Sequence, residues 1–108
     1  MINQFNEYEV LPGVKIKGQR TIGENIGDLG GLNIAYTALM DDLKTKAAPQ
    51  RIDGFTPEQR FFLGWAQVWA AKATDAGLRL QVETDPHSWA RYRVNGPLSN
   101  MPEFAKAF

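Results

Sequence analysis

The sequence contains no cysteine and a single histidine, His87. The absence of cysteine excludes a disulfide framework and any metal site built on thiolates. One histidine is too few for a catalytic zinc site of the two-histidine-plus-carboxylate or three-histidine type within one copy of the chain. A Ser/His/Asp triad is formally possible, but no nucleophile-elbow motif accompanies it.

The chain also has no excess of charge of one sign and no long apolar run. Twelve Lys and Arg balance twelve Asp and Glu, and the basic residues form no cluster, so neither nucleic acid nor an anionic membrane is a predicted partner. No stretch approaches the ~20 apolar residues of a membrane span. With 44% hydrophobic residues in a length of 108, the chain is expected to form one small domain, residues 1–108, around a core.

The periodicity of apolar residues predicts a mainly α-helical domain. Residues 1–22 are expected to be extended or irregular, with a short hairpin or edge strand where Val14 and Ile16 alternate with lysines. A helix is expected from about 24 to 45. Its apolar residues recur at spacings of three and four and form one stripe: Leu29, Leu32, Tyr36, Leu39 and Leu43.

The clearest helix start, "TPEQ", follows a linker predicted over residues 46–55. Thr56 can cap the helix, Pro57 suits its first position and Gln59 completes a capping box. This helix is expected to continue to Gly77. It is apolar over most of its circumference, so it is expected to be buried on several sides.

Three shorter segments complete the expected fold. "LRLQVETD" is predicted to be a short helix or an extended segment. Ser88 is expected to cap one or two helical turns, and "NGP" at 95–97 is expected to break the chain again. "SNMPEFAKAF" is expected to begin a last helix.

The stretch "GENIGDLGG" places two carboxylates, Glu24 and Asp28, one helical turn apart among four glycines. On a helical wheel both carboxylates lie beside the predicted apolar stripe. The ordinary explanation is that they favour the positive N-terminal end of a helix. The alternative is a functional site at which small residues let another backbone come close.

Each of the remaining polar candidates also has an ordinary explanation. Asp85 is by default a turn-forming residue, His87 a surface or capping residue, and Arg93 a solvated or salt-bridged one. Trp65 and Trp69 recur at helical spacing, which is more typical of a core than of a ligand site.

Three segments in order are far more specific: "GQRTIGENIGDLGGL", "TPEQRFFLGWAQVWAAK" and "LRLQVETDPHSWARYRVNGPLSNMPEFAKAF". Together they resemble the C-terminal part of the catalytic domain of neprilysin-family zinc metalloendopeptidases, which include endothelin-converting enzyme and the bacterial oligopeptidase O type. The likeness spans nearly the whole chain. It implies the helical C-terminal subdomain of a thermolysin-like (gluzincin) peptidase that hydrolyses oligopeptides.

The resemblance assigns roles to the two carboxylates. It implies that Glu24 is the third zinc ligand. Asp28 would accept a hydrogen bond from a zinc-binding histidine and orient its ring. Gly27, Gly30 and Gly31 would let the helix of an H-E-x-x-H motif pack close to the metal.

The resemblance also assigns roles to the second cluster of candidates. His87 matches the family's donor to the oxyanion of the tetrahedral intermediate. Asp85 would orient that imidazole and favour its charged form. Arg93 matches the arginine that binds the substrate carbonyl beyond the scissile bond.

No H-E-x-x-H occurs in the sequence, so the chain is expected to be a fragment that lacks the half of the catalytic domain with both zinc histidines and the general base. Zinc is therefore expected in the intact enzyme but not tightly bound in this chain, which is expected to be inactive alone. The expected partners are a peptide substrate, the missing N-terminal half and, through exposed apolar surface, further copies of the chain.

Two other interpretations stay open, a stand-alone helical binding module without catalysis and one chain of a split peptidase. The coding DNA upstream of Met1 distinguishes them by whether and where it encodes H-E-x-x-H. The sequence does not indicate the cellular compartment of the protein. The resemblance is compatible with a bacterial protein that is extracytoplasmic or membrane-anchored at full length.

Overall fold

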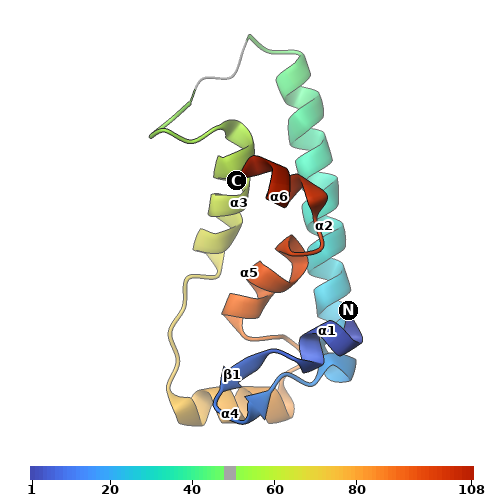
Figure 1. Cartoon of the computed structure of the whole chain (residues 1–108), viewed down its shortest axis with the longest axis vertical. Helices are drawn as coiled ribbons and strands as arrows, with labels where there is room; N and C mark the ends of the chain where they lie inside the picture. Colours follow the sequence, from blue (N-terminus) through green and yellow to red (C-terminus); the bar gives the residue numbers. More distant parts are fainter. Residues whose placement is uncertain (48–50) are drawn as a thin grey trace.

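The longest element is helix α2, Gly18–Lys44, which runs along one side of the molecule (Figure 1). The computed structural model describes residues 1–47 and 51–108. The other described elements are five helices and one hairpin: α1 Ile2–Asn6, β1 Glu9–Leu11, β2 Val14–Lys15, α3 Pro57–Val68, α4 Asp75–Thr84, α5 Ala90–Leu98 and α6 Pro102–Ala107.

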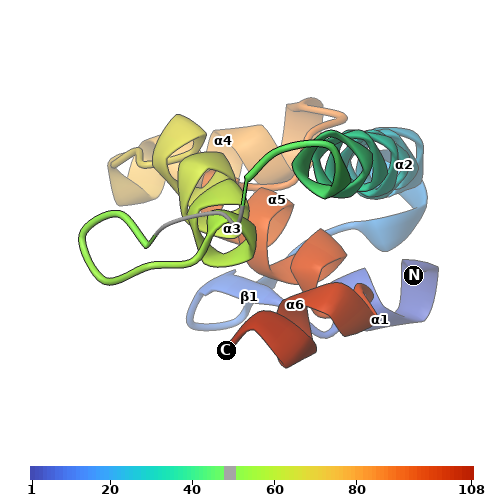
Figure 2. The same ribbon diagram turned by 90° about the horizontal axis from the view of Figure 1, so that it is seen from above.

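The helices enclose a small core between α2 and the C-terminal half of the chain. Helix α3 lies beside the C-terminal half of α2, α5 lies between the two helices, and α6 crosses near α3 (Figures 1 and 2). The buried residues at the centre come from α2, α3, α5 and the start of α6: Leu32, Phe62, Leu98 and Met101. Helix α2, helix α3 and the C-terminal pair α5 and α6 therefore meet in one apolar cluster.

Of the short hairpin or edge strand predicted near Val14, the structure has the hairpin, formed by β1 and β2, and its turn residue Gly13 has a φ of 74°. The preceding helix α1 was not expected from the sequence. It is only five residues long and has no side-chain cap, so it carries no periodic signal. Its Phe5 is fully buried against Gly96 of α5.

The predicted start of the long helix was wrong by six residues. Helix α2 begins at Gly18, whose N–H donates to Asn6 Oδ1 at 2.8 Å. Glycine is unfavourable within a helix, so the glycines at 18 and 23 give no local signal for a helix start. Asn6, the last residue of α1, satisfies a backbone donor that the first turn leaves unpaired.

The helix predicted from Pro57 to Gly77 is two helices. The capping box of Thr56 and Gln59 is confirmed, but α3 ends at Val68. Thr74 caps α4, and the N–H of Gly77 donates to Thr74 Oγ1 at 3.2 Å, so Gly77 lies in a first helical turn and does not end a helix.

Helix α3 is also less buried than its apolar circumference predicted. Only Pro57 and Phe62 are buried, and Val68 is 70% exposed. One of its faces packs on the core, while another is left open.

The sequence "NGP" at 95–97 was predicted to break the chain, but it lies within α5. Gly96 permits the close approach of the Phe5 ring. Ser88 was predicted to cap this helix; the N-cap is Trp89, and the Ser88 hydroxyl donates to Asn25 instead. Part of the predicted linker, residues 48–50, lies outside the described residues.

Among the described residues, no helix has both the length and the low polarity that crossing a membrane requires.

The contact between Gly96 and Phe5 generates a stability prediction. A Cβ at residue 96 would overlap the Phe5 ring, so we expect Gly96→Ala to destabilise the chain by about 1–3 kcal/mol. Gly30→Ala is the matched control, because nothing lies within 4 Å of its added Cβ and alanine favours a helix interior by about 0.5–1 kcal/mol. Urea unfolding measures both, and equal stability of the two variants would contradict the prediction.

Candidate active site

The five side chains singled out from the sequence lie in one continuous line of contacts. Glu24 and Asp28 come from α2, Asp85 caps the C-terminus of α4, His87 follows it, and Arg93 lies in α5. Segments separated by about sixty residues in the chain therefore meet at one place. Among the described residues the line runs from Asp85 through His87, Glu24 and Arg93 to Asp28.

One end of the line holds the imidazole. His87 Nδ1 lies 2.6 Å from Asp85 Oδ1, and the backbone N–H of His87 donates to the same oxygen at 2.8 Å. That backbone hydrogen bond is the main cause of a lowered pKa for Asp85, and the His87 ring lowers it further. Asp85 is therefore ionised at neutral pH and suited to hold an Nδ1–H group, with Nε2 turned the other way.

Nε2 of His87 faces the carboxylate of Glu24, with Oε2 at 3.2 Å. The same Oε2 lies 3.6 Å from Arg93 Nη2. The Glu24 side chain is 45% exposed and that of His87 is 41% exposed. Glu24 thus points toward both His87 and Arg93 while keeping access to solvent.

The other end of the line is a buried ion pair. Arg93 Nε donates to Asp28 Oδ2 at 2.7 Å, and Nη2 donates to Oδ1 at 2.6 Å. Only 13% of the Arg93 side chain and 8% of the Asp28 side chain are exposed. The bidentate hydrogen bonds raise the pKa of Arg93 further, so the planar fork is charged and fixed in orientation.

Two tryptophans of the α3 region support Arg93. Its Cζ lies 4.0 Å from the centroid of the Trp69 ring, a cation–π geometry. Trp65 Nε1 donates to the Arg93 carbonyl at 3.1 Å. In a helix that carbonyl would accept from residue 97, but Pro97 has no N–H. Trp65 therefore satisfies an acceptor that the proline leaves unpaired.

The roles of these tryptophans were not found from the sequence, which suggested only a core. The available signal was Pro97, placed four residues after Arg93, but residues 95–97 were predicted to break the chain and not to continue a helix. Pro97 marks a carbonyl that needs another donor. Nothing in the sequence indicated which side chain supplies it.

The donor set does not complete a metal site by itself. No group of three or more His, Cys, Asp and Glu side chains among residues 1–47 and 51–108 is arranged to hold a metal ion. Glu24 offers an accessible carboxylate, whereas both oxygens of Asp28 are engaged by Arg93. At this place the described residues thus offer one accessible carboxylate, and a metal ion held there would need further ligands.

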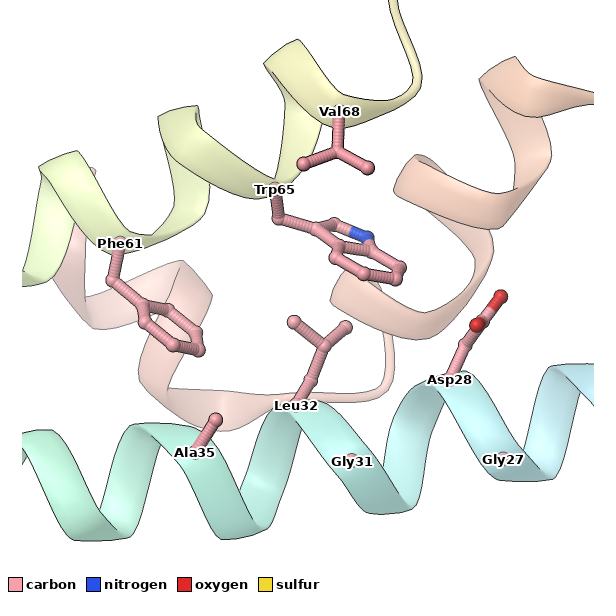
Figure 3. A pocket seen from close by; sticks show the side chains of 8 residues that line it. All are labelled: Gly27, Asp28, Gly31, Leu32, Ala35, Phe61, Trp65 and Val68. Atoms are coloured by element: carbon pink, nitrogen blue, oxygen red, sulfur yellow. The ribbon is translucent and has the colours of Figure 1, made fainter.

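Beside Asp28 lies a largely apolar groove between α2 and α3 with a volume of about 380 Å³. Its floor on α2 is formed by small residues and Leu32, and the aromatic side chains of α3 overhang it (Figure 3). The lining residues are Gly27, Asp28, Gly31, Leu32, Ala35, Phe61, Trp65 and Val68. An added Cβ at either glycine would meet nothing within 4 Å, so this face of α2 is open.

Comparison with known proteins decides the family. The model of peptidase family M13 matches residues 1–108. This chain belongs to peptidase family M13. It is 44% identical over 110 residues to endothelin-converting enzyme 1 of Rattus norvegicus and 40% identical to an endothelin-converting enzyme homolog of Locusta migratoria, covering 100% of this chain in both cases. The predicted family is confirmed.

The fold class is confirmed by a solved M13 structure. The structure of the Mycobacterium tuberculosis zinc metalloprotease Zmp1 with an inhibitor matches 98% of this chain with a TM-score of 0.91 and 41% identity. The chain spans 14–15% of the length of those two curated relatives and 17% of the Zmp1 chain. It therefore corresponds to a small part of each M13 relative.

The buried ion pair of this M13 chain generates a second prediction. Asp28→Asn leaves the Arg93 guanidinium buried without its counter-charge, so we expect a loss of roughly 3 kcal/mol in the free energy of unfolding. Asp41→Asn is the control, since Asp41 pairs with Lys44 on the exposed surface of the same helix, where such a pair contributes about 0.5 kcal/mol or less. Chemical denaturation at neutral pH measures the two losses; similar losses would show that the pair does not hold α5 to α2.

Proposed function

We propose that this chain is the part of a zinc-dependent endopeptidase that supplies the third zinc ligand and the groups that contact the carbonyls of a peptide substrate. Family membership supports a peptidase role. The observation that carries the finer assignment is the approach of Glu24, His87 and Arg93 around one accessible carboxylate oxygen. Glu24 is the proposed metal ligand.

The proposed chemistry of the chain is charge stabilisation and positioning. Zinc, when bound, polarises the scissile carbonyl and activates water. His87 donates from Nε2 to the oxyanion that develops on that carbonyl, and Asp85 holds the ring by Nδ1 so that Nε2 faces the reacting atoms. At 41% exposure His87 can reach a ligand without a large rearrangement.

Arg93 is proposed to bind the substrate carbonyl beyond the scissile bond. Among the described residues, its hydrogen bonds to Asp28 use Nε and Nη2, which leaves Nη1 as a donor. A guanidinium offers five N–H groups in a fixed plane. Asp28 and Trp69 hold that plane, so binding a carbonyl costs little further side-chain entropy.

Asp28 is proposed to play two parts at once. Each of its oxygens accepts one hydrogen bond from Arg93, and a carboxylate has about four acceptor positions. One remaining position can accept the N–H of a zinc-binding histidine and orient its ring. The carboxylate would then connect the metal site to the substrate-binding arginine.

The groove beside Asp28 is proposed to receive the rest of the catalytic domain, in the form of a helix carrying H-E-x-x-H. Its small residues recur every four positions on α2, which allows close helix packing, and its walls are apolar. The relatives' chains are about seven times as long as this one, so ample chain exists in the family to cover it. Without that cover, Phe61, Trp65 and Val68 line an open apolar surface.

The assignment of Glu24 is tested in a polypeptide that joins this chain to an H-E-x-x-H segment, which the coding DNA upstream of Met1 would identify. We expect Glu24→Gln to abolish peptide hydrolysis and to lower zinc affinity by more than the roughly 10–100-fold that loss of an outer-shell partner causes. Glu9→Gln, an exposed carboxylate of β1, should change neither. Zinc competition with a chelator and hydrolysis of an oligopeptide give the two readouts.

The chain alone provides the complementary control. We expect it to hydrolyse no peptide and to bind zinc only weakly, because one accessible carboxylate cannot hold catalytic zinc. A tight one-to-one zinc site in isothermal titration of the monomer would contradict the proposal, as would full activity of the joined polypeptide with Glu24→Gln.

The open groove predicts self-association of the chain when it is alone. Val68 is 70% exposed at the groove and Leu80 is 64% exposed on α4. We expect association that rises with concentration in sedimentation velocity, weakened by Val68→Glu and unchanged by Leu80→Glu, since only the first places a charge in the groove. A monodisperse, well-packed monomer at all concentrations would count against the groove as an interface.

A further inference from the structure

Three buried polar side chains form a link beside the candidate active site that its proposed chemistry does not use. Thr21 is 3% exposed, Asn25 0% and Ser88 2%. Of these, Thr21 and Asn25 lie in α2 and Ser88 lies in the segment before α5. Burial of a polar group is costly unless the group is hydrogen-bonded, so each must have partners.

The partners are one another. The Ser88 hydroxyl donates to Asn25 Oδ1 at 2.9 Å, and Asn25 Nδ2 donates to Thr21 Oγ1 at 2.9 Å. Thr21 Oγ1 in turn donates to the Lys17 carbonyl at 3.4 Å. The chain of hydrogen bonds thus ties the segment before α5 to the first turns of α2.

The link is placed one residue away from both reactive groups. Asn25 directly follows Glu24, and Ser88 directly follows His87. The Glu24 and His87 side chains that contact each other are 45% and 41% exposed. Ion pairs between exposed side chains contribute little to stability. The buried hydrogen bond between Asn25 and Ser88 is the stronger constraint on where the two backbones lie.

We propose that Asn25 and Ser88 are positioning residues that hold the His87 segment in register with α2, so that His87 Nε2 faces the Glu24 carboxylate. The catalytic meaning of that register rests on the function proposed above. The geometric claim concerns only this chain. On this proposal Asn25 belongs to the site without contacting a ligand, because it fixes the position of the backbone next to His87.

Nuclear magnetic resonance of the 108-residue chain tests the link directly. Nuclear Overhauser cross-peaks between the His87 ring protons and the Glu24 side chain report the register at neutral pH. We expect Ser88→Ala to abolish these cross-peaks while the amide spectrum stays dispersed, and Ser88→Thr, which keeps the hydroxyl, to retain them. Asn33→Ala is the matched control, because Asn33 is an exposed asparagine of α2 whose side chain donates to the Leu29 carbonyl of the same helix.

A second variant changes the acceptor of the same hydrogen bond. Asn25→Ala removes the acceptor and is expected to abolish the same cross-peaks. Retention of the cross-peaks in a folded Ser88→Ala chain would overturn the proposal. Global unfolding by Ser88→Ala would also overturn it, because the link would then hold the whole fold and not the register of His87.

The experiment separates this proposal from the proposed function. If Glu24→Gln leaves zinc affinity unchanged in the joined polypeptide, the zinc assignment fails while the cross-peaks are unaffected. If Ser88→Ala leaves the cross-peaks unchanged, the positioning role fails while the zinc assignment is unaffected.

Discussion

The buried pair of Asp28 and Arg93 is the interaction on which the site depends. It joins α2 to α5 through two hydrogen bonds of 2.6–2.7 Å and is nearly closed to solvent. A buried charge without its partner is strongly unfavourable, so the pair defines the distance between the two helices. Trp69 covers the guanidinium and Trp65 satisfies the Arg93 carbonyl, which extends the same constraint to the end of α3.

The site divides into a buried support and an accessible front. Asp28, Arg93, Asn25 and Ser88 are buried or nearly so, whereas Glu24 and His87 are each about half exposed. This division agrees with the roles proposed for Glu24 as a metal ligand and for His87 as an oxyanion donor. A metal ligand or an oxyanion donor has to be reached from outside, while the groups that orient it work best where water does not compete and rotamers are locked by packing.

Two glycines of α2, Gly27 and Gly31, are unfavourable for a helix and lie on its open face beside the groove. Each glycine in a helix interior costs about 0.5–1 kcal/mol relative to alanine, yet Gly27 and Gly31 have free space where a Cβ would stand. Nothing within the described residues requires their small size. A close partner on that face would require it, which agrees with a chain that spans 14–15% of two M13 relatives.

The sequence by itself determined the family, the mainly helical fold class, the capping box at Thr56 and the apolar stripe of α2, because motif order, local capping and periodicity are all properties of neighbouring residues. It also singled out the five polar residues that prove to lie together. Only the tertiary structure decided where α2 begins, that α3 ends at Val68, and that Asn95 to Pro97 continue a helix. For two of these the partner comes from another part of the fold. Asn6 binds the N–H of Gly18, and at residues 95–97 Phe5 packs on Gly96 while Trp65 binds the carbonyl that Pro97 leaves unpaired. The pairing of Arg93 with Asp28 and of Ser88 with Asn25 belongs to the same class, since a hydrogen bond across more than sixty residues has no local signature.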